Sequence, residues 1–508
     1  MKKIFLIISI ITALLLLTIA LIWTWAYRTY FYTKPLNQQE LKNITPDWTK
    51  ATKGNWSPWH TDPTDPTNTK TWNPTASFNH WLTTIPDQNK AWPILIDTIL
   101  ANPQIFKHEA LGDYPDNPEH WNQITTLIQS TQGQNAITQL KKALTRPTLG
   151  CGLYTSTETH LHQALLKHGL QDDNWNPNPN PNPSSIDILL PALGSLRNSA
   201  HFLKSAAIYE LTNNNPDEFV ELVQTIYTSA QLANETPIII GQLVEIAIKA
   251  TANDLIMWSL EQHPETFTDQ HLAKLSSIIE DARIQTFIWQ GQALLFRDTI
   301  RRTVIDNGQP NPTSINSAFS DGSITSTPSS FPAAQLHPSL QRLFYVHDLV
   351  AKQAELRSRI PWDPTLQPSD TIYQQHKDSL NKVSQILMDT LLPALDQAAA
   401  RFQGLAQQSI AARTLLALHR HKLRHNTFPQ ALNDLDQDLL TFNPMDIFTG
   451  NQLHYQPTNE GPLLYALGND RDDDQGRYKK GVLSITKPID ADWPMYSNHK
   501  LNKLYPDD

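Results

Sequence analysis

The chain has 508 residues, a formal net charge of −9 and one cysteine. This length exceeds what one hydrophobic core usually holds, and the lack of a basic excess argues against sequence-independent nucleic-acid binding. A single cysteine excludes an intrachain disulfide and a thiolate zinc cage.

The first 34 residues predict a membrane anchor. From Ile4 to Tyr27 no side chain is charged, and these 24 residues, as a helix, are long enough to cross a bilayer core of about 30 Å. Lysines precede the stretch and aromatic residues follow it, as at membrane interfaces. A cleaved signal peptide is the alternative, but its apolar region would be shorter and would end in small residues. We therefore expect an uncleaved, single-pass anchor in the cytoplasmic membrane, with the body outside the cytoplasm.

The body is predicted to alternate between helical regions and polar connections. Residues 35–77 indicate an irregular spacer. The Asn-Pro alternation in 174–187 predicts an extended linker, because proline removes a donor and disfavours helix at the preceding residue. Residues 307–336, rich in Ser, Pro and Asn, predict a flexible insertion. The remaining segments are the helical regions 78–173, 188–306 and 337–403, and a C-terminal unit, 404–508.

Residues 188–306 carry the clearest helical pattern. Asn215 is suited to cap a helix that begins at Pro216, and apolar residues recur after it at helical spacing. The next segment, 236–258, is apolar on most sides and is expected to be a buried central helix. Short connections between such helices predict antiparallel hairpins and a solenoid-like body.

The pattern changes toward the C-terminal end. Pro393 is expected to interrupt a long helix, and Gly404 is a second candidate break. Two short aromatic segments, 451–456 and 463–467, flank a turn and predict a β-hairpin, with 481–487 as a candidate third strand. The predicted fold class is therefore mainly α, with an N-terminal transmembrane helix, a helical-hairpin body and a small α+β C-terminal domain.

Four aspartates lie within the five positions 470–474. Carboxylates at alternate positions can converge on calcium, which takes six to eight oxygen ligands. An EF-hand does not fit, because Gln475 stands at its glycine position and Gly481 at the position of its bidentate glutamate. Two further acids follow in "PIDADW" and can fold back; a solvated acidic turn is the alternative. The candidate calcium ligands are Asp470, Asp472, Asp474, Asp490 and Asp492.

The same region resembles known families. "TFPQAL", "MDIFTGNQLHY" and "LLYALGNDRDDD" follow one another in the order and spacing of the C-terminal domain of major pseudopilins of type II secretion. The segment resembles more closely the C-terminal part of a group of uncharacterised, membrane-anchored bacterial envelope proteins, as does the middle of the chain. The pseudopilin resemblance implies a calcium ion in the last loop, assisted by the acids of "DAD" at 490–492. It does not imply filament assembly, since no prepilin cleavage motif precedes the anchor.

Histidines and the cysteine give weaker signals. His421 and His425 are spaced to share a helix face and can hold a transition metal, but basic residues interleave, and cations are favoured at a helix C-terminus. His162 and His168 do not share a face well. Cys151, between two glycines, is a candidate nucleophile, although a lone cysteine is usually a small buried apolar residue. No nucleophile elbow or phosphate-binding loop occurs.

The sequence thus favours a membrane-anchored, extracytoplasmic helical scaffold or interaction protein with a candidate structural Ca²⁺ loop and no assigned catalytic residue. Two alternatives remain open: an envelope hydrolase with an unrecognised site, and an accessory component of a type II-like secretion system. The expected partners are the membrane and, as candidates, envelope proteins. Nucleic acid is not expected, and the sequence leaves the oligomeric state open.

Overall fold

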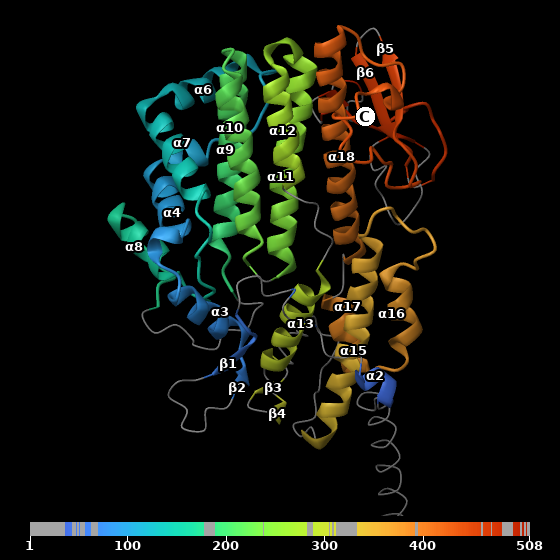
Figure 1. The fold of residues 1–508 in the computed structure, drawn as a ribbon. Coiled ribbons are helices and arrows are strands. Elements are labelled where there is room, and N and C mark those ends of the chain that lie inside the picture. Colours follow the sequence, from blue (N-terminus) through green and yellow to red (C-terminus); the bar gives the residue numbers. More distant parts are fainter. Residues whose placement is uncertain are drawn as a thin grey trace, which may run out of the picture.

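The computed structural model is mainly helical, with a small three-stranded antiparallel sheet near its C-terminal end, as the sequence predicts (Figure 1). The predicted anchor, 1–34, lies outside the described residues. Among the helices that are described, none has both the length and the apolar character that crossing a membrane requires. The described residues are 36–42, 47, 50, 56–61, 70–176, 188–236, 238–281, 288–303, 305–306, 309–310, 333–391, 395–458, 461–468, 470–479, 491–497, 500–501 and 504.

A row of helices stands side by side through the middle of the molecule (Figure 1). One begins as predicted: the Asn215 side chain accepts the N–H of Glu218, and Pro216 occupies the first turn. The apolar segment predicted at 236–258 forms most of α11, which packs against α9, α10 and α18. The row consists of α9 (Pro191–Thr212), α10 (Pro216–Ala233), α11 (Ile239–Gln262), α12 (Asp269–Asp281) and α18 (Leu395–His425).

The hairpins α9–α10 and α10–α11 form as expected, but the body is a bundle and not a solenoid. In a solenoid each repeat contacts only its neighbours. Here α18, far along the chain, packs against both α11 and α12. Pro393, where we expect an interruption, lies outside the described residues, between α17 (Lys382–Leu391) and α18. Gly404 does not break α18; it is buried, and packing offsets the cost of about 1 kcal/mol for one helical glycine.

Short helices cover the α9 and α10 side of the bundle (Figure 1). The predicted spacer, 35–77, is more ordered than its composition suggests: within it β1 (Trp59–Thr61) pairs antiparallel with β2 (Lys70–Trp72), and Trp56 is buried edge-to-face against Phe78 at 5.4 Å. The helices on this side are α3 (Pro74–Thr83), α4 (Trp92–Ala101), α5 (Pro103–Phe106), α6 (Pro118–Gln129), α7 (Thr131–Leu144) and α8 (Thr159–Lys167). Helix α2 (Gln38–Lys42) lies apart from them, beside α15, where Glu40 pairs with Arg342 (Figure 1).

A second hydrophobic cluster lies in the lower half of the molecule and joins the remaining helices to the foot of α18 (Figure 1). Part of the predicted flexible insertion, 307–336, belongs to regular elements, because one short strand and the start of a helix lie in it. The elements here are α13 (Trp289–Thr303), β3 (Ile305–Asp306), β4 (Gln309–Pro310), α15 (Ala333–Arg357) and α16 (Ser369–Lys377).

The C-terminal unit packs beside the upper part of α18 (Figure 1). Its sheet has the order β5-β6-β7, all antiparallel, and the hairpin pairs His454 with Tyr465 as predicted for two aromatic segments. The expected third strand at 481–487 lies outside the described residues; β7 is the third strand. The buried side chains of the unit belong to the same hydrophobic cluster as those of α11 and α18. The elements are η4 (Leu432–Asp434), β5 (His454–Thr458), β6 (Gly461–Ala466) and β7 (Trp493–Pro494).

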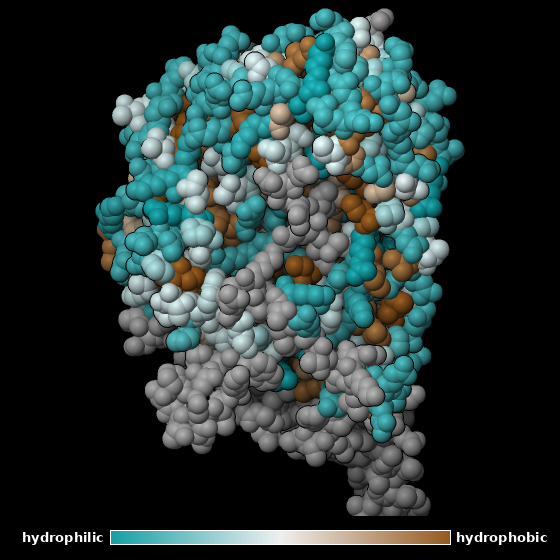
Figure 2. Space-filling model, in the orientation of Figure 1, coloured by the Kyte–Doolittle hydropathy of each residue, from teal (hydrophilic) through white to brown (hydrophobic). Residues whose placement is uncertain are grey.

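The face of the molecule in Figure 2 is mostly hydrophilic over the upper helices. Apolar side chains appear on it as small, separate spots, several of them beside α16 and α17. Scattered exposed apolar residues are normal for a folded protein. The candidate sites lie instead in the polar clusters and hollows of the C-terminal half.

Candidate cation-binding loop and neighbouring groove

Asp446 fixes the turn that precedes the β-hairpin. Its side chain is fully buried, and its carboxylate accepts the N–H of Phe448 at 2.8 Å, the Thr449 hydroxyl at 3.1 Å and the N–H of Leu467 at 3.1 Å. Gly450 completes the turn with a φ of 75°, a conformation that favours glycine. The motif "DIFTG" therefore links the start of the hairpin to the end of β6, immediately before the acidic loop.

The acidic loop turns sharply twice within residues 470–479. Arg471 has a φ of 64°, Gln475 a φ of 58° and Gly476 a φ of 80°. A left-handed conformation costs a non-glycine residue roughly 1–2 kcal/mol, so other contacts must hold the first two. The Arg471 guanidinium lies over the Trp362 ring, 5.0 Å from its centroid. The loop is thus anchored on the helical body through its basic residue.

Asp492 comes later in the chain than the acidic loop and is hydrogen-bonded to it at Gly476 and Arg477. It is fully buried; its Oδ2 accepts the N–H of Gly476 at 2.7 Å, while its own N–H donates to the Arg477 carbonyl at 2.7 Å. Its Oδ1 is buried and has no hydrogen-bond partner among the described residues. Burial raises the pKa of Asp492 to about 6; the Gly476 amide opposes this shift, and the charges of Asp473 and Asp474 add to it. At neutral pH the loop therefore holds a carboxylate with one uncompensated oxygen.

The remaining predicted ligands divide into two groups. Asp470 and Asp474 each keep a buried Oδ2 that no described donor reaches, although the other oxygen of Asp474 accepts Arg477 Nη2 at 2.6 Å. Asp472 is exposed, and its Oδ1 only accepts the N–H of the next residue. Asp490 lies outside the described residues. Of the predicted calcium ligands, Asp470, Asp474 and Asp492 each have a buried carboxylate oxygen, whereas the Asp472 side chain points to solvent.

Asp473, which the alternating pattern passed over, faces the sheet. Its Oδ1 accepts the Tyr465 hydroxyl at 3.1 Å, and its Oδ2 lies 3.5 Å from His454 Nδ1. In an extended segment successive side chains point to opposite faces. The left-handed residue at 471 shifts that alternation, so Asp472 points to water and Asp473 to the sheet.

The chemistry of these acids fits a hard cation better than a hydrogen-bonding role. Three buried carboxylate oxygens without donors are costly unless something positive compensates them. Side chains alone do not complete a site, because within the described residues no three acids of this loop have ligand atoms within 4.8 Å of one another. Backbone carbonyls and water, which calcium accepts readily, would supply the rest of its shell.

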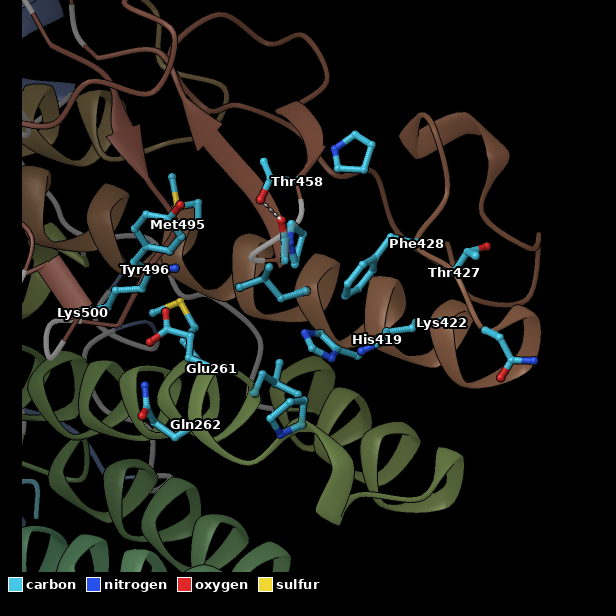
Figure 3. A pocket seen from close by; sticks show the side chains of 18 of the residues that line it. Glu261, Gln262, His419, Lys422, Thr427, Phe428, Thr458, Met495, Tyr496 and Lys500 are labelled. Carbon is cyan, nitrogen blue, oxygen red and sulfur yellow. Dashed lines mark hydrogen bonds between the residues drawn. The ribbon is translucent and has the colours of Figure 1, made fainter.

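A groove of about 710 Å³ lies between the ends of α11 and α18 and the β-hairpin (Figure 3). The Glu261 carboxylate and the His419 imidazole, which line this groove, already contact other side chains of the protein. Both oxygens of Glu261 accept from Ser497, whose N–H lies at 2.9 Å and whose hydroxyl lies at 2.5 Å. Burial lowers the pKa of His419 to about 4, and its ring packs edge-to-face on Phe428 at 5.3 Å. Ser497 is fully buried, and it occupies both oxygens of the Glu261 carboxylate that lines the groove.

The candidate residues of the N-terminal half also have structural roles. Cys151 is buried, and burial, followed by the charges of Glu158 and Glu235, raises the pKa of its thiol well above the usual range. A thiol held in its protonated form is a poor nucleophile. His162 lies 2.9 Å from Asp172, and His168 lies 2.9 Å from Asp97, so these two rings are partners of separate carboxylates.

Comparison of the chain with protein-family models, with curated proteins and with solved structures finds no match. The class that the fold and the loop define is a helical bundle with a small β-unit and a candidate cation-binding loop. The similarity to pseudopilins and to envelope proteins remains a prediction from the sequence motifs.

Proposed function

We propose that this protein is a membrane-tethered helical scaffold whose C-terminal β-unit binds a structural calcium ion through the acidic loop. The single observation that carries the calcium proposal is Asp492, a fully buried carboxylate with one oxygen that no described donor reaches. A cation at this oxygen would offset the repulsion from Asp473 and Asp474. It would also hold the left-handed turn at 471 and the second turn at 475–476 in place.

The groove between α11, α18 and the β-hairpin favours a binding role over catalysis. Its carboxylate and its imidazole are both used in packing: Glu261 holds Ser497, and His419 stays neutral against Phe428. The tether is proposed from the uncharged stretch of residues 4–27. A single tether with the body outside the cytoplasm suits a scaffold that presents its bundle to envelope proteins, including the alternative of a secretion-system accessory.

Calorimetric titration of the chelator-treated full chain in detergent tests the calcium site. We expect binding of calcium but not of magnesium, because magnesium demands near-ideal octahedral geometry and gives up water reluctantly. Calcium should also raise the melting temperature in proportion to RT ln(1 + [Ca²⁺]/Kd). Absence of both signals at millimolar calcium would overturn the calcium proposal.

Two matched aspartate variants sharpen this experiment. Asp492→Asn removes the buried charge and should abolish the calcium response. Asp472→Asn removes an equal charge from the same loop, but that side chain is exposed and should leave binding unchanged within about threefold. Equal loss in both variants would mean that the loop attracts calcium only by its net charge, which contradicts a built site.

The tether has its own test. Protease added to intact spheroplasts should digest the body while the membrane fraction keeps the N-terminal stretch. Protection of the body in intact spheroplasts, with digestion only after lysis, would place it in the cytoplasm and refute the proposed topology.

A further inference from the structure

A second group of metal-ligating side chains lies at the C-terminal end of α18. His421 and His425 come from successive turns of that helix, and Asp436 follows η4, where the chain turns back toward it. One ligand atom of each residue lies within 4.8 Å of the other two. No other three histidine, cysteine, aspartate or glutamate side chains in the described segments meet this condition.

The separations are close to those of a tetrahedral site. His425 Nε2 lies 3.2 Å from each oxygen of Asp436, and His421 Nδ1 lies 3.9 Å from Asp436 Oδ1. The centroids of the two imidazole rings are 4.3 Å apart. Zinc bonds of about 2.0–2.2 Å to nitrogen and oxygen set neighbouring ligand atoms about 3.4 Å apart. Small rotations of these side chains would therefore complete the geometry.

His421 supplies an independent sign of a missing partner. The residue is only 8% exposed, and its Nδ1 is buried without a hydrogen-bond partner among the described residues. If the histidines were only solvated cations at the helix C-terminus, this role would explain His425, which pairs with Asp436. It would not explain the buried and unpaired Nδ1 of His421.

The two oxygens of Asp436 face different partners. Oδ1 lies 3.2 Å from His425 Nε2 and 3.9 Å from His421 Nδ1. Oδ2, which is also 3.2 Å from His425 Nε2, accepts Arg424 Nη1 at 3.2 Å. Arg424 in turn holds both oxygens of Asp438 at 2.9 Å and lies 3.7 Å from Asp269. A carboxylate that binds a metal through one oxygen is commonly held by a hydrogen bond on the other.

The local charge also suits a divalent cation. Three carboxylates at this end of α18, those of Asp269, Asp436 and Asp438, pair with the two guanidinium groups of Arg420 and Arg424. A fourth carboxylate, that of Asp434, also lies near His421 and accepts the Ala431 N–H. Lys422 is directed to a separate acid, Glu265, at 3.2 Å. The basic residues that interleave with the histidines in the sequence are thus neutralised by acids from other elements.

We propose that His421, His425 and Asp436 bind a divalent transition metal ion of the zinc type. Two imidazoles and one carboxylate are borderline ligands that suit zinc rather than calcium or magnesium. Because the His425 side chain is 48% exposed, solvent reaches the remaining coordination position, and water would fill it. The ion would tie the end of α18 to the turn that leads into the β-unit.

Cobalt titration of the chelator-treated full chain in detergent tests this proposal. Cobalt substitutes for zinc and gives visible absorption when nitrogen ligands bind it in a site of low coordination number. We expect one equivalent to bind with such absorption and zinc to displace it. His425→Gln and Asp436→Asn should each weaken binding by more than about tenfold, since loss of even an outer-shell partner costs about 10–100-fold.

Two controls separate this site from general effects. His120→Gln removes another partly exposed histidine, whose side chain is 37% exposed, and should bind cobalt as the wild type does. Asp492→Asn should also keep the cobalt signal, which separates this site from the calcium loop. Wild-type cobalt affinity in both His425→Gln and Asp436→Asn would overturn the proposal, as would a wild-type chain that gives no visible absorption.

A thermal readout guards against misfolded variants. Zinc should raise the melting temperature of the wild type and of His120→Gln but not that of His425→Gln or Asp436→Asn. Because both of these ligands are partly exposed, the variants should unfold near the metal-free wild type. A zinc-induced rise that persists undiminished in His425→Gln and Asp436→Asn would contradict the site.

Discussion

Without calcium, replacing Asp492 by asparagine should stabilise the protein at neutral pH. The reason is the raised pKa of this carboxyl, about 6 compared with about 3.9 in an unfolded chain. Between these values the folded form binds a proton that the unfolded form releases, so wild-type stability falls as pH rises through this window. Asparagine cannot ionise, and its side-chain oxygen can still accept the N–H of Gly476.

The pKa difference sets the magnitude. Two pKa units correspond to an upper limit of about 3 kcal/mol. Screening by water around this surface loop reduces the expected gain to about 1–2 kcal/mol. With an unfolding entropy of about 2.1 cal/mol/K per residue, the melting temperature of a 508-residue chain moves by about 1 °C for each kcal/mol.

Differential scanning calorimetry of both chains with chelator, at about pH 7.5 and about pH 4.5, measures this effect. Asp492→Asn should melt about 1–2 °C above the wild type at the higher pH and close to it at the lower. Millimolar calcium should narrow this difference at the higher pH, because only the wild type gains a bound ion. A variant that is less stable by the same amount at both pH values would refute the reasoning.

Three further substitutions test the packing around the site and the bundle. Asp446→Ala leaves the buried N–H groups of Phe448 and Leu467 without an acceptor and should lower stability by about 2–5 kcal/mol in urea unfolding, with Asp446→Asn losing less. Burial raises the pKa of Glu235 to about 7, so wild-type stability should fall as pH rises from about 4.5 to about 7, and Glu235→Gln should flatten that part of the pH–stability curve. Asn215→Ala removes the cap of α10 and should cost about 1 kcal/mol, whereas Asn215→Asp should be nearly neutral; equal losses would contradict the capping role.

Local signals in the sequence were enough to predict the elements that depend on neighbours in the chain. Asn215 and Pro216 mark the start of α10, and the apolar run at 236–258 marks α11, because caps and helical periodicity act over a few residues. The β5–β6 hairpin also follows from two aromatic segments around a short turn. These features required no knowledge of distant contacts.

Features that depend on distant contacts were missed. Gly404 would weaken an isolated helix, but α18 packs against α11 and α12, and the local sequence pattern does not show that packing. The same contact replaces the predicted solenoid by a bundle. In the acidic loop, alternation predicted Asp472 inside; the left-handed residue at 471 turned it out and brought Asp473 to the sheet.

The histidine site illustrates the same limit. His421 and His425 are recognisable as a pair in the sequence, but cations at the end of a helix are the simpler interpretation as long as the position of Asp436 is unknown. Asp436 comes from a short turn after the helix, and nothing in its sequence neighbourhood marks it as a ligand. Only the fold brings it within 3.2 Å of His425 and pairs the interleaved Arg424 with separate acids.

The two proposed ions would both hold the C-terminal β-unit, each at a different place. The histidine site joins the end of α18 to the turn before the β-unit, and the acidic loop joins the end of β6 to β7. Loops that bind calcium outside the cell often have dissociation constants of about 10⁻⁴–10⁻³ M. Such a loop is filled only in a compartment outside the cytoplasm, where free calcium reaches these concentrations. A zinc-type site with two imidazoles does not require that compartment. The order of the calcium loop therefore depends on which side of the membrane the body faces, whereas the histidine site at the end of α18 does not depend on it. A body moved to the cytoplasm would lose the calcium ion and keep the zinc-type ion.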